Sequence, residues 1–123
     1  MGILIVESDA GLAGVWARHL RRHHHQVDVA ASQAEAESVM PRQDVRVLIL
    51  SLVLVAGSAL AVADFASYRR PDARVLFVTR RSFFSDGSIF KLAPNAAGFL
   101  GTNIEPEDLT ALVDHHAAGG STT

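Results

Sequence analysis

The sequence contains no cysteine among its 123 residues. This absence excludes disulfide bonds, thiol catalysis and cysteine-ligated zinc, and it fits a reducing cytoplasm, which is the expected location. Lysine is nearly absent as well, and Lys91 is the only one in the chain. The formal net charge is −2. A chain without an overall positive field is not expected to have nucleic acid or an anionic membrane as its main partner.

The sequence also lacks a convincing membrane or export segment. The run 47–63 holds seventeen residues without a charge, which is the lower limit for crossing about 30 Å of hydrocarbon. Gly57-Ser58 divides it into a β-branched half and an alanine-rich half, a pattern that favours a strand, a turn and a helix. The apolar run near Met1 is too short for a signal peptide, so secretion is not expected.

Length and composition predict a single globular domain. Hydrophobic residues make up 49% and charged residues 20% of the chain, close to the globular average, which excludes disordered and low-complexity classes. We expect one domain over residues 1–117. The glycine- and threonine-rich residues 118–123 are expected to form a disordered tail.

Apolar runs and helical patterns alternate along the whole chain. Strands are predicted at Ile3–Val6, Gln26–Ala30, Val45–Leu50, Arg74–Thr79 and Ala97–Leu100, with a helix after each. Asp9 is a candidate N-cap, and Ser32 with Glu35 forms the S-x-x-E pattern of a capping box. This (βα)5 pattern predicts an α/β fold: a three-layer, doubly wound, flavodoxin-like sandwich with parallel strand order 2-1-3-4-5.

Ligands of such folds bind beyond the carboxyl ends of the strands. The polar residues expected there are Glu7, Ser8, Asp9, Ser51, Thr79 and Thr102, with Asn103 beside them. Glu7 and Asp9 could hold a hard cation through oxygen ligands. They could equally be local, with Asp9 capping the first helix and Glu7 solvated at a strand end.

Four of these strand ends resemble signature segments of bacterial response-regulator receiver domains. They are Ile3-Leu4-Ile5-Val6-Glu7-Ser8-Asp9, Val47-Leu48-Ile49-Leu50-Ser51-Leu52, Val75-Leu76-Phe77-Val78-Thr79 and Gly98-Phe99-Leu100-Gly101-Thr102-Asn103-Ile104. The resemblance covers nearly the whole chain. It implies a signalling module in a two-component system, with a sensor kinase or another signalling protein as its partner.

The resemblance also assigns roles by position. Glu7 and Ser8 stand where the family has an acidic pair that binds Mg²⁺, and Ser51 stands at the phosphoaccepting aspartate. Thr79 matches the hydroxyl of the fourth strand, Phe99 matches the switch aromatic, and Thr102-Asn103 stand at a Lys-Pro dipeptide.

The chain departs from the family in its chemistry. A serine cannot form an acyl phosphate, and Lys91 lies too early in the sequence to serve the fifth strand. Glu7 without carboxylates at positions 8 and 51 should hold Mg²⁺ poorly, so no cofactor or resident metal is expected. We therefore predict a degenerate, non-enzymatic receiver domain that works by protein contact without aspartyl phosphorylation.

Aromatic residues gather around the helix predicted at Ser85–Leu92. Aromatic residues with arginine are typical of interaction hot spots, and the residues concerned are Arg81, Phe83, Phe84, Phe90 and Phe99, with Arg80 beside them. The expected partner face, which could also form a homodimer, comprises this helix, the fifth strand and the last helix. The alternative is that Phe90 belongs to the core and the other phenylalanines cover the sheet edge.

Two other functions stay open. One is a flavodoxin-like ligand-binding domain or small enzyme that uses the polar strand ends, although no G-x-G-x-x-G or G-x-S-x-G spacing supports it. The other is a receiver phosphorylated at a different carboxylate, such as Asp9. His19 and His23 have the i, i+4 spacing of metal ligands, but a polar loop explains them and no metal site is predicted.

Overall fold

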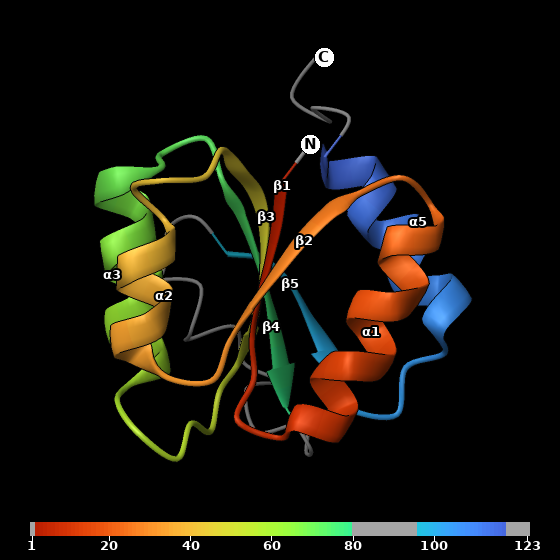
Figure 1. Ribbon diagram of the computed structural model, residues 1–123, viewed down its shortest axis with the longest axis horizontal. Coiled ribbons are helices and arrows are strands. Elements are labelled where there is room, and N and C mark those ends of the chain that lie inside the picture. The colour runs from red at the N-terminus through yellow and green to blue at the C-terminus, as the bar shows by residue number, and fades with distance from the viewer. Residues whose placement is uncertain (1, 80–95, 118–123) are drawn as a thin grey trace.

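Five parallel strands form one sheet in the computed structural model, which describes residues 2–79 and 96–117 (Figure 1). The strands are β1 (Gly2–Val6), β2 (Gln26–Ala30), β3 (Val45–Ser51), β4 (Arg74–Thr79) and β5 (Ala96–Gly101). Their order is β2-β1-β3-β4-β5, which confirms the predicted topology. Each strand agrees with its prediction to within one residue at either end.

Helices cover both faces of the sheet (Figure 1). The helices are α1 (Ala10–Arg22), α2 (Gln33–Val39), α3 (Ala59–Arg69) and α5 (Pro106–Ala117). Helices α1 and α5 lie on one face, and α2 and α3 lie on the other. The three-layer arrangement is therefore confirmed. The helix predicted at Ser85–Leu92 and the tail 118–123 lie outside the described residues.

Side-chain caps begin the first two helices. Asp9 Oδ1 accepts a hydrogen bond from the Leu12 N–H at 3.2 Å, and Ser32 Oγ accepts one from the Glu35 N–H at 3.2 Å. The return bond of the capping box differs slightly from expectation. Glu35 Oε1 accepts from the N–H of Ala31 at 2.9 Å, one residue before the cap.

The core lies in two layers because strand side chains alternate between the faces of the sheet. Leu4, Leu48 and Phe77 are buried with the α2–α3 layer, whereas Ile49 and Trp16 are buried with the α1–α5 layer. The central strands are covered on both faces, which explains why they read as continuous apolar runs.

The uncharged run 47–63 is divided as predicted among β3, a loop and the start of α3. Across residues 2–79 and 96–117, every helix is too short or too polar to cross a bilayer.

Two polar contacts join elements at the amino ends of the strands. His25, just before β2, contacts Asp114 of α5 through Nε2 and Oδ1 at 2.5 Å. Arg21 of α1 donates from Nη2 to the carbonyl oxygen of Val27 at 2.8 Å. Both contacts connect segments of the α1–α5 layer to the edge strand β2.

His116 in the last turn of α5 provides a pH-dependent term in stability. Burial lowers its pKa from the ordinary 6.5, with smaller contributions from the positive charges of His115 and Arg74. The unfolded chain therefore binds a proton at His116 more readily than the folded chain, so stability falls as the pH drops from above 6.5 toward the folded-state pKa.

We expect His116→Gln to remove this term. Urea unfolding at about pH 7.5 and about pH 5.5 should show the wild type losing more free energy of unfolding between the two conditions than the variant loses. An equal or greater loss in the variant would contradict the assignment.

Candidate functional site

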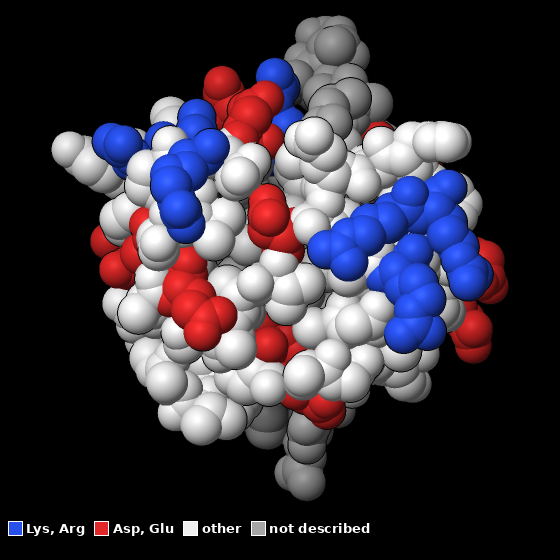
Figure 2. Space-filling view, viewed as in Figure 1, with Lys and Arg blue, Asp and Glu red and all other residues white. Residues whose placement is uncertain are grey.

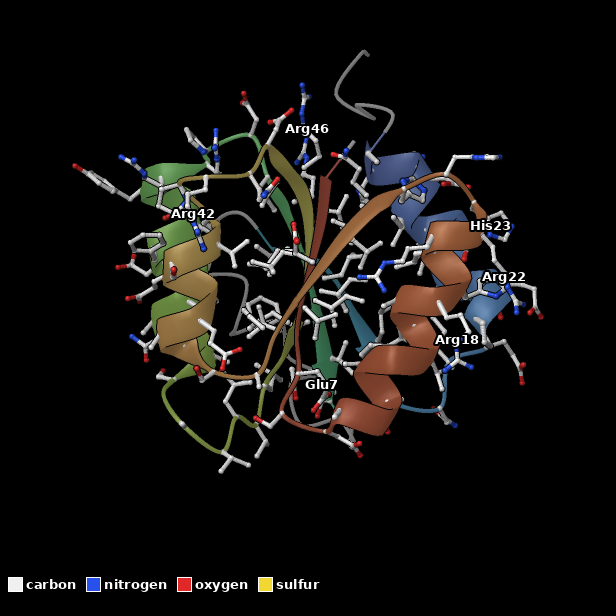
Figure 3. All side chains as sticks on the ribbon, viewed as in Figure 1. Glu7, Arg18, Arg22, His23, Arg42 and Arg46 are labelled. Carbon is white, nitrogen blue, oxygen red and sulfur yellow. The ribbon has the colours of Figure 1, made fainter. Side chains whose placement is uncertain are left out.

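The carboxyl ends of the strands meet at one edge of the sheet, where Glu7 follows β1 (Figure 3). Val6 of β1 pairs with Leu50 of β3, so the next residues, Glu7 and Ser51, occupy neighbouring positions. Both are buried, with 6% of Glu7 and 7% of Ser51 exposed. The structure therefore brings the predicted acidic position and the predicted acceptor position together.

Ser51 is the last residue of β3, and its hydroxyl turns into its own loop. Ser51 Oγ donates to the carbonyl oxygen of Val53 at 3.1 Å. The main chain continues the ladder beyond the strand, since the Leu52 N–H donates to the Val78 carbonyl oxygen at 2.9 Å. Ser51 thus has a structural hydrogen bond in a buried position.

Glu7 and Asp9 both bind backbone N–H groups at the start of α1. A Glu7 carboxylate oxygen accepts from the Asp9 N–H at 3.0 Å, while Asp9 is exposed and caps the helix at Leu12. The local interpretation is therefore confirmed for Asp9 as an N-cap, but its expectation that Glu7 is solvated is wrong, because Glu7 is buried. Within the described ranges, no group of three or more histidine, aspartate or glutamate residues is placed to hold a metal ion.

The donor set does not suit a resident Mg²⁺ ion. Mg²⁺ prefers octahedral oxygen ligation by carboxylates together with phosphate oxygens and water. Among the described residues Glu7 has the one buried carboxylate, which accepts a backbone hydrogen bond, and its neighbour Ser51 offers a hydroxyl that donates to the Val53 carbonyl oxygen.

Ser8 joins three loops that are distant in sequence. Its Oγ donates to the carbonyl oxygen of Ala31 at 3.0 Å and accepts from the N–H of Val55 at 3.0 Å. One hydroxyl thereby connects the loop after β1 with the loops after β2 and β3. An ionised aspartate at this position could not donate to the Ala31 carbonyl oxygen. Serine therefore connects the loops better than would the acidic residue expected here from the family that the chain resembles.

Gly57 fixes the far end of the loop after β3. Its φ of +100° is favourable only for glycine, and an added Cβ would lie 2.3 Å from the Cβ of Gln33. Gln33 in turn accepts from the Ser58 N–H through Oε1 at 2.9 Å. The loop is therefore held against the start of α2 as well as by Ser8.

Thr79 and Thr102 come together at the ends of β4 and β5. The Thr102 N–H donates to the Thr79 carbonyl oxygen at 3.2 Å, and Asn103 Oδ1 lies 2.6 Å from where a Cβ on Gly101 would stand. Phe99 lies in β5, in register with Phe77. The other predicted partner-binding residues, Arg81, Phe83, Phe84 and Phe90, lie outside the described residues.

Two exposed valines border the site and were not predicted. Val53 is 77% exposed and Val55 is 90% exposed, although they belong to the uncharged run 47–63, whose apolar composition suggests burial. Gly57-Ser58 predicted a turn in this run, but it did not indicate that the valines just before the turn would lie on the surface. Exposed apolar side chains therefore lie beside the buried polar residues of the site.

Solved receiver domains have the same architecture. A CheY-like response-regulator receiver domain protein from Methanospirillum hungatei is similar at 19% identity and a TM-score of 0.87, covering 98% of this chain and 95% of that one. The non-phosphorylated HemR receiver domain from Leptospira biflexa is similar at 23% identity and a TM-score of 0.83, covering 95% and 94%.

A third structure is a response regulator protein from Burkholderia pseudomallei with a phosphorylated aspartic acid, a calcium ion and citrate. It is 22% identical, with a TM-score of 0.82, covering 98% of this chain and 70% of that one. No family model matches the sequence, and no curated protein matches it either. At these identities the likenesses show the fold, which is that of response-regulator receiver domains.

Proposed function

We propose that the chain is a receiver-like signalling module, without enzymatic activity, that works by protein contact and does not pass through an aspartyl phosphate. The fold supports the signalling role, and the serine at position 51 supports the absence of an aspartyl phosphate. An acyl phosphate needs a carboxylate nucleophile, and an alcohol would need a general base to activate it. Ser51 Oγ instead donates to the Val53 carbonyl oxygen, and among residues 2–79 and 96–117 no base forms a hydrogen bond with it.

The surroundings of Ser51 support weak or absent Mg²⁺ binding as part of the same proposal. Ser8 bridges two neighbouring loops, Glu7 accepts from the Asp9 N–H, and each polar group thereby stabilises the apo state. A two-state element shifts only when a ligand binds one state better than the other. With no phosphoryl group or cation to do so, the conformation is set by the sequence or by a protein partner.

The test is incubation of the full chain with Mg²⁺ and acetyl phosphate, followed by intact mass measurement. We expect no added phosphoryl mass. Any added phosphoryl mass would overturn the proposal, and borohydride trapping of an acyl phosphate followed by tandem mass spectrometry would then locate the modified carboxylate. Modification at Asp9 would revive the alternative of a receiver with a non-standard acceptor.

The part of the proposal that concerns protein contact rests on the aromatic residues predicted from the sequence. Phe84→Asp should abolish recovery of a binding protein from the native cytoplasm. Tyr68→Asp is the matched control, because Tyr68 is an aromatic residue of α3 that is 82% exposed. Equal recovery by the wild type and both variants would rule out the proposed docking face.

A further inference from the structure

The most one-sided distribution of charge along the chain is found in α1 and the turn after it. Of the eight residues from 18 to 25, all except Leu20 are arginine or histidine, and no acidic residue occurs from 10 to 27. Figure 2 shows the arginines gathered as one patch over α1. We define the α1 basic patch as Arg18, Arg21, Arg22, His23 and His24, all of them exposed.

The charges of this patch are not neutralised within the described residues. Arg21 donates to the carbonyl oxygen of Val27, and His23 Nδ1 lies 3.1 Å from the carbonyl oxygen of His19, so both contacts are with backbone groups. Arg18 and Arg22 have no ion pair in the described part of the chain. Arg46, by contrast, pairs with Asp44 at 3.3 Å.

The helix dipole accounts for part of this arrangement. Cations in the last turn of a helix are stabilised by the negative end of the dipole, which suits Arg21 and Arg22. The dipole does not require the basic run to continue past the helix through His23 and His24.

The backbone at His24 is a second, independent observation. His24 has a φ of +69°, which makes it the one residue other than glycine with a left-handed backbone in the part of the chain that is described. Glycine adopts this conformation without the steric cost and is the usual residue just beyond a helix C-terminus. A histidine here places a further hydrogen-bond donor on the patch at some expense in stability.

We propose that the α1 basic patch is a docking surface for an acidic segment of a partner protein. Arg18 and Arg22 are one helical turn apart, about 6 Å along the axis, so they can each take one carboxylate of a short acidic run. The guanidinium group binds carboxylates through two parallel hydrogen bonds, which favours such pairs over a diffuse charge contact.

A short acidic segment fits better than a polyanion. The patch occupies one helix, whereas the chain as a whole carries a net charge of −2. A nucleic acid or an anionic membrane would extend beyond the patch and meet the acidic remainder of the surface, which includes the red groups visible in Figure 2. The proposal is independent of phosphorylation and of the proposed function, because it rests on the arginines and histidines of α1 and not on Ser51 or the residues at the carboxyl ends of the strands.

The chain offers a matched pair of double variants, labelled in Figure 3. Arg18→Gln with Arg22→Gln removes two charges from the patch. Arg42→Gln with Arg46→Gln removes two exposed charges, one from the turn after α2 and one from the start of β3. Circular dichroism should show that both double variants keep the wild-type fold, since all four side chains lie on the surface.

Fluorescence anisotropy with a labelled poly-glutamate peptide at low salt tests the proposal. We expect the Arg18 and Arg22 double variant to bind about fivefold to tenfold more weakly than the wild type, and the control to change by less than about twofold. Binding should also weaken as salt is added.

Four results would overturn the proposal. The wild type could fail to bind the peptide, or both double variants could weaken binding equally. A DNA duplex, or vesicles of anionic lipid, could bind more tightly than the peptide and lose that binding in the Arg18 and Arg22 variant. Either outcome would assign the patch to a different class of partner.

Discussion

Replacing Trp16 with alanine is expected to lower the free energy of unfolding by about 3–5 kcal/mol. Trp16 is the only tryptophan, and at 2% exposed it is among the largest fully buried side chains described. It packs from α1 into the core between the sheet and α5, together with Leu20 and Val113. Truncation leaves a cavity that a helix tied at both ends cannot collapse to fill.

The loss should be visible as a shift in the midpoint of urea unfolding followed by far-ultraviolet circular dichroism. Tryptophan fluorescence cannot serve, because the substitution removes the fluorophore. Val15→Ala is the matched control, since Val15 precedes Trp16 on the same helix and is 47% exposed, so its cost should be within about 0.5 kcal/mol. A loss below about 1 kcal/mol for Trp16→Ala would mean that the side chain does not fill the core.

The large effect matters for function because domains of this size have total stabilities of about 5–15 kcal/mol. A loss of this size would leave a measurable unfolded population. It would also release α1, which carries the basic patch and whose N-cap, Asp9, accepts from Leu12 and donates to the carboxylate of Glu7. The site and the patch therefore both depend on the same buried ring.

The strands and helix starts could be read from the sequence because their causes are local. Continuous apolar runs such as Val45–Leu50 follow from burial on both faces, and Asp9 and Ser32 cap their helices through bonds to the third residue after them. Such signals lie within one turn or one strand. The order of strands was then predicted as the common one for five such units in a doubly wound sheet, and the structure has that order.

The contacts that define the site could not be read in this way. Ser8 meets Ala31 and Val55, which are 23 and 47 residues away, and His25 meets Asp114 across 89 residues. Side-chain hydrogen bonds of this kind depend on how the loops pack after the sheet has formed. The sequence alone identified Ser8 as a member of the polar edge but gave no indication that it bridges three loops.

Replacing Ser51 with aspartate is expected to lower the free energy of unfolding by about 3 kcal/mol near neutral pH. Ser51 is buried, and neighbouring parallel strands lie about 4.8 Å apart, so the new carboxylate would stand beside the buried carboxylate of Glu7. Two like charges in a poorly hydrated site repel each other, and neither recovers its lost hydration.

Ser51→Asn separates charge from size, because asparagine has nearly the same volume as aspartate and no charge. It should cost only about 1 kcal/mol, through the lost hydrogen bond to the Val53 carbonyl oxygen. Thermal melts with EDTA and with Mg²⁺ then complete the comparison. Mg²⁺ should restore much of the stability of the aspartate variant, because two carboxylates on adjacent strands offer the oxygen ligands that the ion prefers.

The same melts test whether the native serine is what keeps the site free of a cation. Ligand binding stabilises the folded state in proportion to the logarithm of ligand concentration over the dissociation constant, so weak binding produces no shift at modest Mg²⁺. The wild type and Ser51→Asn should therefore melt at the same temperature with EDTA and with Mg²⁺. An equal Mg²⁺ shift in all three proteins would place the cation on groups other than residue 51. It would contradict the interpretation that the serine hydroxyl beside Glu7, in place of a carboxylate, is the reason that Mg²⁺ binds this site weakly or not at all.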